Sequence, residues 1–262
     1  MKYTVVTSIN RHYWENEGVQ LNLQSWDKFF PKSVEIHIYS EDLQPAEIKL
    51  SKRVIVHNLY RECSELTAFI EQHKDDPHYN GTKQHPEYKW NAIKFAHKTF
   101  PIFRQARQTQ GTLIWLDADV LAVQHLSPQQ LDAICPPNYC VNYLGRPGTH
   151  SECGYVTYNL EHEEGLNFVK HFESYYYNSK LSTIEQTHDS FVFDEARKSF
   201  GKEKIFNDIN YFSKTNKHPF DKTILNQFFI HTKGDGKNRR VIKNMKRFRL
   251  ERFGLHSSTS NK

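Results

Sequence analysis

The sequence lacks paired cysteines, long apolar runs and internal repeats. Its four cysteines show neither a C-x-x-C pair nor zinc spacing with histidine, so we expect reduced thiols rather than a disulfide framework. No apolar run reaches the roughly 18 residues that would predict a transmembrane helix. The first residues, MKYTVVTSIN, are too short and polar for a signal peptide and are typical of a first strand. These absences favour a cytoplasmic protein, with peripheral attachment to a membrane left open.

Basic residues gather near the carboxyl terminus. The formal net charge of the whole chain is only +5, but between residues 237 and 252 a single acid, Glu251, opposes a run of cations. The run consists of Lys237, Arg239, Arg240, Lys243, Lys246, Arg247, Arg249 and Arg252. Two interpretations stay open. The segment is either a solvated terminal helix face or a surface for anionic lipid or nucleic acid.

Short β-rich runs alternate with helical patterns along the first half of the chain. Strands are predicted at 3–8, 34–39, 54–57 and 113–117, and helices at 16–30 and 90–107, the second interrupted near Pro101. Strands that alternate with helices favour a mainly parallel, doubly wound sheet, in which ligands bind beyond the carboxyl ends of the strands. The fold class is therefore α/β.

The second half continues with a strand in 151–160, a helix at 163–177 and a turn leading into a helix at 187–196. Residues 75–87, rich in Pro, Gly, Asn and Asp, are predicted to form a loop. With 262 residues and no clear linker, we expect one domain over 1–262. Its halves would be a nucleotide-binding part, 1–120, and an acceptor-binding part, 121–236, followed by a basic tail, 237–262.

The most informative run is LIWLDADVL, residues 113–121. Four apolar residues predict a buried strand, which ends at Asp117, Ala118 and Asp119. Carboxylates at positions i and i+2 project to the same side of an extended chain. Paired hard oxygen ligands suit Mg²⁺ or Mn²⁺, and such a cation suits a diphosphate. This pattern indicates an enzyme that handles a nucleotide-activated group.

A second motif lies near the carboxyl terminus. His231, Gly234 and Lys237 have the spacing H-x-x-G-x-x-K. An imidazole can complete a metal site held by two carboxylates, glycine lets backbone approach a phosphate, and lysine offers a point charge to a diphosphate. Taken alone, the histidine is typical of a structural residue and GDGK of a tight turn, so the motif gains meaning only beside the aspartates.

Together these motifs resemble the retaining GT-A glycosyltransferases, and most closely the glycogenin and bacterial lipopolysaccharide galactosyltransferase family. TSINRHYW (7–14) is similar to that family's first strand and loop, SECGYVTYNL (151–160) to its aromatic and glycine strand, and HDS (188–190) to its short acidic motif. The chain departs from the family at Asn238 and Arg239, where Pro and Trp are usual, and at Glu152, where Asn is usual.

The resemblance implies a GT-A fold and a set of site residues. It implies that Asp117, Asp119 and His231 bind Mn²⁺ or Mg²⁺. Donor binding would fall to Asp117, Gly234 and Lys237 at the diphosphate, and to Thr7, Ser8, Asn10 and Tyr13 at the base. The implied activity is transfer of a sugar from a nucleoside diphosphate, with UDP expected, to an acceptor hydroxyl with retention of configuration.

A carboxylate on the far face of the sugar would stabilise an oxocarbenium-like transition state. Asp189 is the first candidate, with a helix N-cap as the competing interpretation, and Glu152 is the second, with a structural salt bridge as its alternative. Lys94 and Lys98 form an i, i+4 pair that we interpret as a solvated helix face rather than as phosphate ligands.

Several alternatives stay open on sequence alone. The acceptor is a glycan, a glycolipid or, if the basic tail holds DNA, a hydroxymethylated base extruded from the duplex. A nucleotidyltransferase would share the metal carboxylates but usually has a glycine-rich basic loop after the first strand, where this chain has TSINRHYW. A non-enzymatic nucleic-acid-binding protein would leave both motifs unexplained. Oligomeric state is not indicated.

Overall fold

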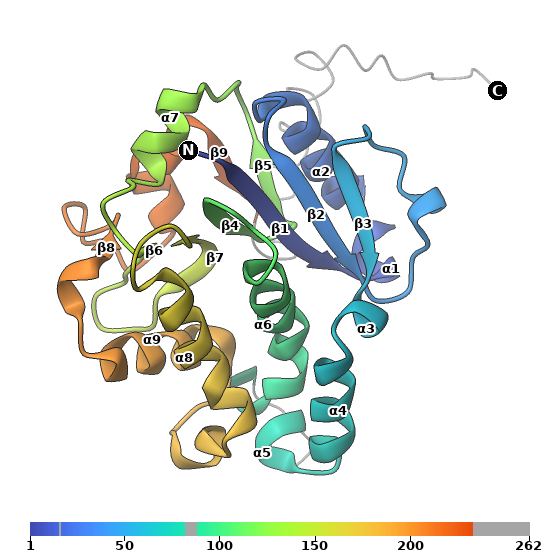
Figure 1. Cartoon of the computed structure of the whole chain (residues 1–262), viewed down its shortest axis with the longest axis vertical. Coiled ribbons are helices and arrows are strands. Elements are labelled where there is room, and N and C mark those ends of the chain that lie inside the picture. The colour runs from blue at the N-terminus through green and yellow to red at the C-terminus, as the bar shows by residue number, and fades with distance from the viewer. Residues whose placement is uncertain (16, 82–87, 233–262) are drawn as a thin grey trace. The chain divides into compact units, whose positions relative to one another are not determined.

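The computed structural model describes residues 1–15, 17–81 and 88–232, and its described core is a seven-stranded sheet (Figure 1). The strand order is β3-β2-β1-β4-β7-β6-β8. The bounds are β1 Tyr3–Ile9, β2 Glu35–Ser40, β3 Val54–Asn58, β4 Thr112–Leu116, β6 Val141–Leu144, β7 Glu152–Asn159 and β8 Phe206–Asp208. Only β7 runs antiparallel to its neighbours, so the prediction of a mainly parallel α/β sheet is confirmed.

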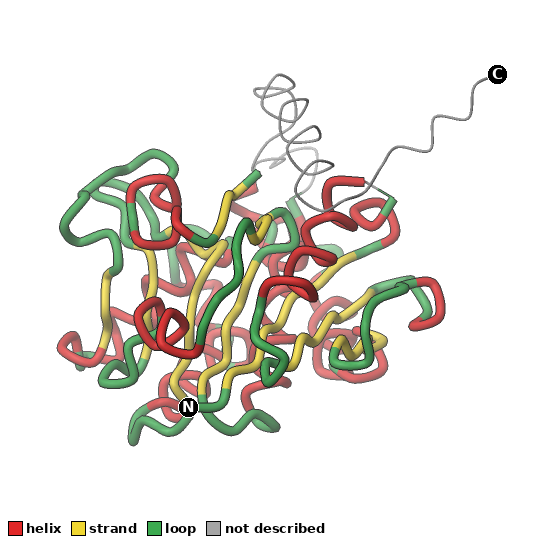
Figure 2. Tube along the Cα trace, turned by 90° about the horizontal axis from the view of Figure 1, so that it is seen from above, coloured by secondary structure: helices red, strands yellow, loops and turns green. Residues whose placement is uncertain are grey.

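Helices cover both faces of the sheet (Figures 1 and 2). From β1 to β3 the chain moves outward along the sheet, and from β3 to β4 it returns past β2 and β1. Because crossovers between parallel strands are right-handed, this reversal puts α2 (Glu17–Phe29) and α6 (Ala92–Ala106) on opposite faces. The face under α6 also carries α4 (Ser64–His73), α8 (Gly165–Tyr177) and α9 (Asp189–Phe200), which share one aromatic-rich core.

The other α-helices and strands of the described residues are short. They are α1 Arg11–Trp14, α3 Leu59–Glu62, α5 Pro77–Asn80, α7 Pro128–Ile134, β5 Val120–Ala122 and β9 Phe229–His231. Strands β5 and β9 pair antiparallel in a separate two-stranded sheet, with Val120 opposite His231. This pairing brings a segment from the end of the described chain against the turn that follows β4.

Two local predictions need correction. Helix α6 continues through Pro101 without interruption, because the proline is buried among the apolar residues of the helix core and packing there outweighs one missing backbone hydrogen bond. Part of the predicted loop at 75–87 is the short helix α5, which begins with Pro77 after an Asp76 cap. Residues 82–87 lie outside the described residues.

Residues Met1–His231 form one compact unit. The assignment of donor and acceptor halves within it stays a prediction. The basic tail, 237–262, lies outside the described residues, as do its expected lipid and nucleic-acid contacts. In the described part of the chain, every helix is too short or too polar to cross a membrane.

Candidate metal centre and donor site

Two carboxylates and one imidazole meet at the carboxyl end of β4. One possible ligand atom from each of Asp117, Asp119 and His231 lies within 4.8 Å of the others. Asp117 follows β4 directly, and a turn closed by the bond from Val120 N to Asp117 O, 2.9 Å, places Asp119 just before β5. Pairing of β9 with β5 then supplies His231, whose Nε2 is 3.1 Å from Asp119 Oδ1. The three predicted ligands therefore do come together.

Helix α2 holds the turn that carries the aspartates. Asn22 Nδ2 donates to Ala118 O at 3.0 Å, and Trp26 Nε1 donates to Val120 O at 2.7 Å. These two donors lie one helical turn apart on α2, and the carbonyls that they bind lie on either side of Asp119. The position of the aspartates is thus fixed by a buried helix rather than by the loop alone.

The two oxygens of Asp117 have different surroundings. Its Oδ1 accepts from Trp115 Nε1 at 2.7 Å and lies 2.9 Å from Lys98 Nζ. Its Oδ2 faces Gly154, where an added Cβ would lie 3.3 Å from that oxygen and 3.0 Å from His231 Cε1. The missing side chain at position 154 therefore leaves space beside two of the three ligands.

This donor set fits a divalent cation. Carboxylate oxygens with one imidazole suit Mn²⁺ or Mg²⁺ better than a soft metal. Burial opposes a charge on His231, but the hydrogen bond and charge of Asp119 raise the pKa of the imidazole above its ordinary value. Burial raises the pKa of Asp117 despite the neighbouring Lys98 ammonium. A cation held here would add positive charge beside two acids, which pair in this structure with Lys98 and with His231.

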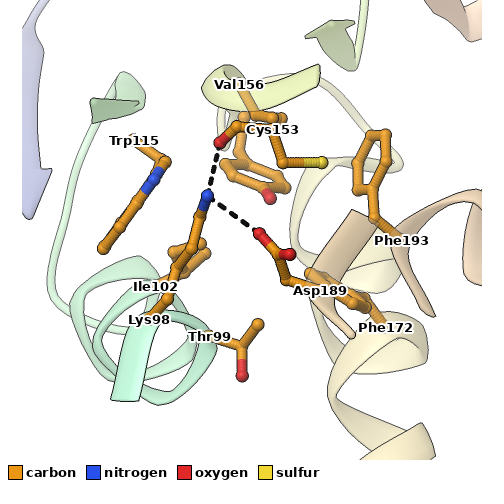
Figure 3. A pocket seen from close by; sticks show the side chains of 10 residues that line it. Lys98, Thr99, Ile102, Trp115, Cys153, Val156, Phe172, Asp189 and Phe193 are labelled. Atoms are coloured by element: carbon orange, nitrogen blue, oxygen red, sulfur yellow. Dashed lines mark hydrogen bonds and ion pairs between the residues drawn. The ribbon is translucent and has the colours of Figure 1, made fainter. Parts of the chain in front are cut away.

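Lys98 is the main residue that sequence reasoning missed. The prediction of a solvated lysine pair is wrong for Lys98, because its side chain is only 15% exposed and joins two acids. Its Nζ lies 2.9 Å from Asp117 Oδ1. The same atom lies 2.9 Å from Asp189 Oδ2 and 2.6 Å from Cys153 O, two contacts that Figure 3 shows. Burial alone would lower the pKa of this lysine, but the two carboxylates raise it well above its ordinary value. Lys94 is exposed, as predicted.

Asp189 lies across Lys98 from the metal ligands. It is the first residue of α9, whereas the N-cap is His188, so the competing interpretation of Asp189 as the cap is wrong. Burial raises the pKa of this carboxyl, but the adjacent ammonium more than compensates, and the pKa is lowered. The side chain is therefore a buried carboxylate that points at Lys98 (Figure 3), and both residues line a cavity of about 10 Å³.

Glu152 also reaches the site. The residue is buried at the start of β7, where its Oε1 accepts from Gly154 N at 3.3 Å. Its Oε2 lies 3.7 Å from Arg146 Nη1, so the alternative of a salt bridge has a partner in the structure. The catalytic roles of Asp189 and Glu152 stay predictions.

The residues expected at the nucleotide base lie in the last part of β1, Thr7 and Ser8, and just after it, Asn10 and Tyr13, at the same edge of the sheet. Thr7 is fully buried and Ser8 is half-buried. Asn10 caps α1 by accepting from Tyr13 N at 2.9 Å, and Tyr13 is 51% exposed. Contact of this group with a base stays a prediction. Gly234 and Lys237, expected at the diphosphate, lie outside the described residues.

Comparison with known proteins gives a match in fold. No protein-family model matches the sequence, and no curated protein matches it. Many solved structures match, among them the crystal structure of mouse xyloside xylosyltransferase 1, apo form. The matched region covers 90% of this chain and 95% of the xylosyltransferase chain. The TM-score is 0.51 and the sequence identity is 12%. The chain therefore shares its α/β fold with a glycosyltransferase, and its closer resemblance to the glycogenin group stays a prediction.

Proposed function

We propose that this protein is a metal-dependent glycosyltransferase that moves a sugar from a nucleoside diphosphate to an acceptor hydroxyl. The observation that carries the proposal is the cluster of Asp117, Asp119 and His231 beside the Lys98–Asp189 pair. This cluster lies at the carboxyl edge of a doubly wound sheet, where such folds bind their ligands. The shared fold with a xyloside xylosyltransferase supports the same class of reaction.

The site residues divide into those that hold the donor and those that face the sugar. A divalent cation held by Asp117, Asp119 and His231 would neutralise charge on the departing diphosphate. Asp189, held ionised by Lys98, stabilises positive charge at the anomeric carbon as the bond to phosphate breaks. The acceptor oxygen bonds to that carbon, and the acceptor proton passes to the departing diphosphate. Retention of configuration and a UDP donor complete the proposal.

Thermal unfolding with nucleotides tests the proposal. The protein is heated with UDP, GDP, CDP or ADP, each with and without Mn²⁺. At a hundred times its dissociation constant a ligand adds about 2.7 kcal/mol to the free energy of unfolding, which is visible as a higher Tm. We expect one nucleotide, UDP, to raise the Tm in a manner that requires Mn²⁺.

Two variants serve as a matched pair. Asp119→Asn removes a metal ligand and should abolish the Mn²⁺-dependent increase. Asp75→Asn, at an exposed acid outside the site, should keep it. An absence of any increase with all four nucleotides, or an equal increase in Asp119→Asn, would contradict the proposal.

A further inference from the structure

The edge of the sheet that holds the metal centre continues beyond it. Strands β6 and β8 run parallel to each other, and β7, antiparallel to β4 and β6, begins where those two strands end. The segment after β6, the first residue of β7 and the end of β8 therefore lie along the same edge as Asp117. Ligands of a doubly wound sheet bind along this edge.

An inner cavity of about 490 Å³ has Arg146 in its wall, and Arg146 Nη1 lies 3.7 Å from Glu152 Oε2. Its lining includes Arg146, the partner of Glu152, together with Asp194, Arg197 and Asp208. Hydrogen bonds fix its wall, because Gly145 N donates to Asp208 Oδ1 at 2.8 Å and Ser151 donates to Asp194 through both N and Oγ. Arg146 thus connects the cavity wall to Glu152, whose Oε1 accepts from Gly154 N beside the metal ligands.

An outer cavity of about 400 Å³ shares three lining residues with the inner one: Tyr143, Arg197 and Asp208. Five of its lining residues are aromatic: Tyr139, Tyr143, Phe206, Tyr211 and Phe212. Tyr211 is 61% exposed and Phe212 is 93% exposed, so both rings meet solvent. We call these two neighbouring cavities together the edge groove.

The chemistry of the edge groove suits a neutral glycan. Aromatic faces stack on the C–H faces of sugars, and carboxylates, amides and guanidinium groups hydrogen-bond their hydroxyls. The outer cavity offers Glu203, Asn207, Asp208 and Arg197 beside its rings. A phosphodiester chain needs clustered cations. The charged side chains that line the whole edge groove instead balance, with the three bases Arg146, Arg197 and Lys198 and the three acids Asp194, Glu203 and Asp208.

We propose that the edge groove binds the acceptor as a glycan, with its remote units on Tyr211 and Phe212 and its reacting end beside Glu152. The inference rests on the proposed function, because that function makes the bound glycan the acceptor. The acceptor is then a carbohydrate rather than DNA. The residues that recognise it, such as Tyr211 and Phe212, are distant in sequence from Asp117 and Asp119.

The test is glycan binding without metal or donor. Malto-, xylo- and chito-oligosaccharides of increasing length are titrated into the full chain by ligand-observed NMR and calorimetry. We expect at least one series to bind, with affinity increasing with length. Tyr211→Ala and Phe212→Ala should each raise the Kd roughly tenfold, because each removes a stacking face. Tyr211→Phe keeps the ring and should keep most of the affinity.

Controls separate this inference from the proposed function. Tyr177→Ala removes an exposed ring outside the groove and should leave glycan affinity unchanged, and Asp119→Asn should also bind glycan normally. Two outcomes would contradict glycan binding in the edge groove and leave the proposed function standing. One is Mn²⁺-dependent nucleotide binding without any glycan binding, and the other is glycan binding that is unchanged in Tyr211→Ala and Phe212→Ala. Glycan binding as expected, with no nucleotide binding, overturns the proposed function alone. Binding of hydroxymethylated DNA that is lost in Tyr211→Ala overturns the glycan assignment.

Discussion

At the scale of single residues, the site depends on one buried lysine between two acids. Asp117 and Asp189 are far apart in sequence, and Lys98 pairs with both at 2.9 Å. The sequence patterns predicted both aspartates but not the lysine, because an i, i+4 pair of lysines on a helix usually faces solvent. Lys98 could have been suspected from the two predicted aspartates, because carboxylates removed from water need a positively charged partner.

Removing the Lys98 charge should destabilise the fold. In Lys98→Met, two carboxylates would stay buried without their cation, at a cost of about 3 kcal/mol in the free energy of unfolding. Lys94→Met, at an exposed position one turn away, should change it by about 0.5 kcal/mol or less. Urea denaturation of the two variants measures the difference. Equal stability of both would show that Lys98 does not balance these acids.

At the scale of elements, local sequence patterns predicted the main strands and helices well. They did not predict which distant segments pair with each other. The strand expected at 113–117 is β4, Thr112–Leu116, and the helix expected at 163–177 is α8, Gly165–Tyr177. The pairing of β9 with β5 was not predicted, because a strand of three residues carries no periodicity. That pairing is nevertheless what places His231 beside Asp119.

Strands β2 and β3 carry a stack of rings that makes a pH-dependent contribution. His57 lies opposite Tyr39 and stacks on both Tyr39 and His37, with its Nε2 2.8 Å from His37 Nδ1. Burial, helped by the charge on His37, lowers the pKa of His57 to about 4. The folded state therefore binds fewer protons than the unfolded state between that value and the ordinary pKa of histidine.

Stability should consequently fall as pH drops from about 7 toward about 4, and this group should contribute about 1 to 2 kcal/mol of the decrease by pH 5. His57→Phe keeps a ring in the stack and should show a smaller decrease, whereas His12→Phe at an exposed position should show the full decrease. Chemical denaturation over this pH range gives the comparison. The same pH dependence in His57→Phe and the unmodified protein would contradict this account.

At the scale of the whole described unit, one edge of the sheet collects the candidate chemistry. The carboxyl ends of β1 and β4, the start of β7 and the ends of β6 and β8 follow one another along it. The doubly wound pattern predicted at which edge of the sheet the candidate metal ligands would lie. It did not predict the edge groove, because the cavity walls combine α9 with residues of β6, β8 and the segments that flank both strands, rather than any single motif.

The central claim is that Asp117, Asp119 and His231 hold a divalent cation together with a nucleotide. Electron paramagnetic resonance tests it directly, because free Mn²⁺ gives a six-line signal that weakens when the ion is bound. We predict that the protein with UDP removes free Mn²⁺ at a ratio of one ion per chain, and that His231→Gln weakens this binding by at least about tenfold. An unchanged free Mn²⁺ signal in the presence of protein and nucleotide, or full binding by His231→Gln, would contradict the account.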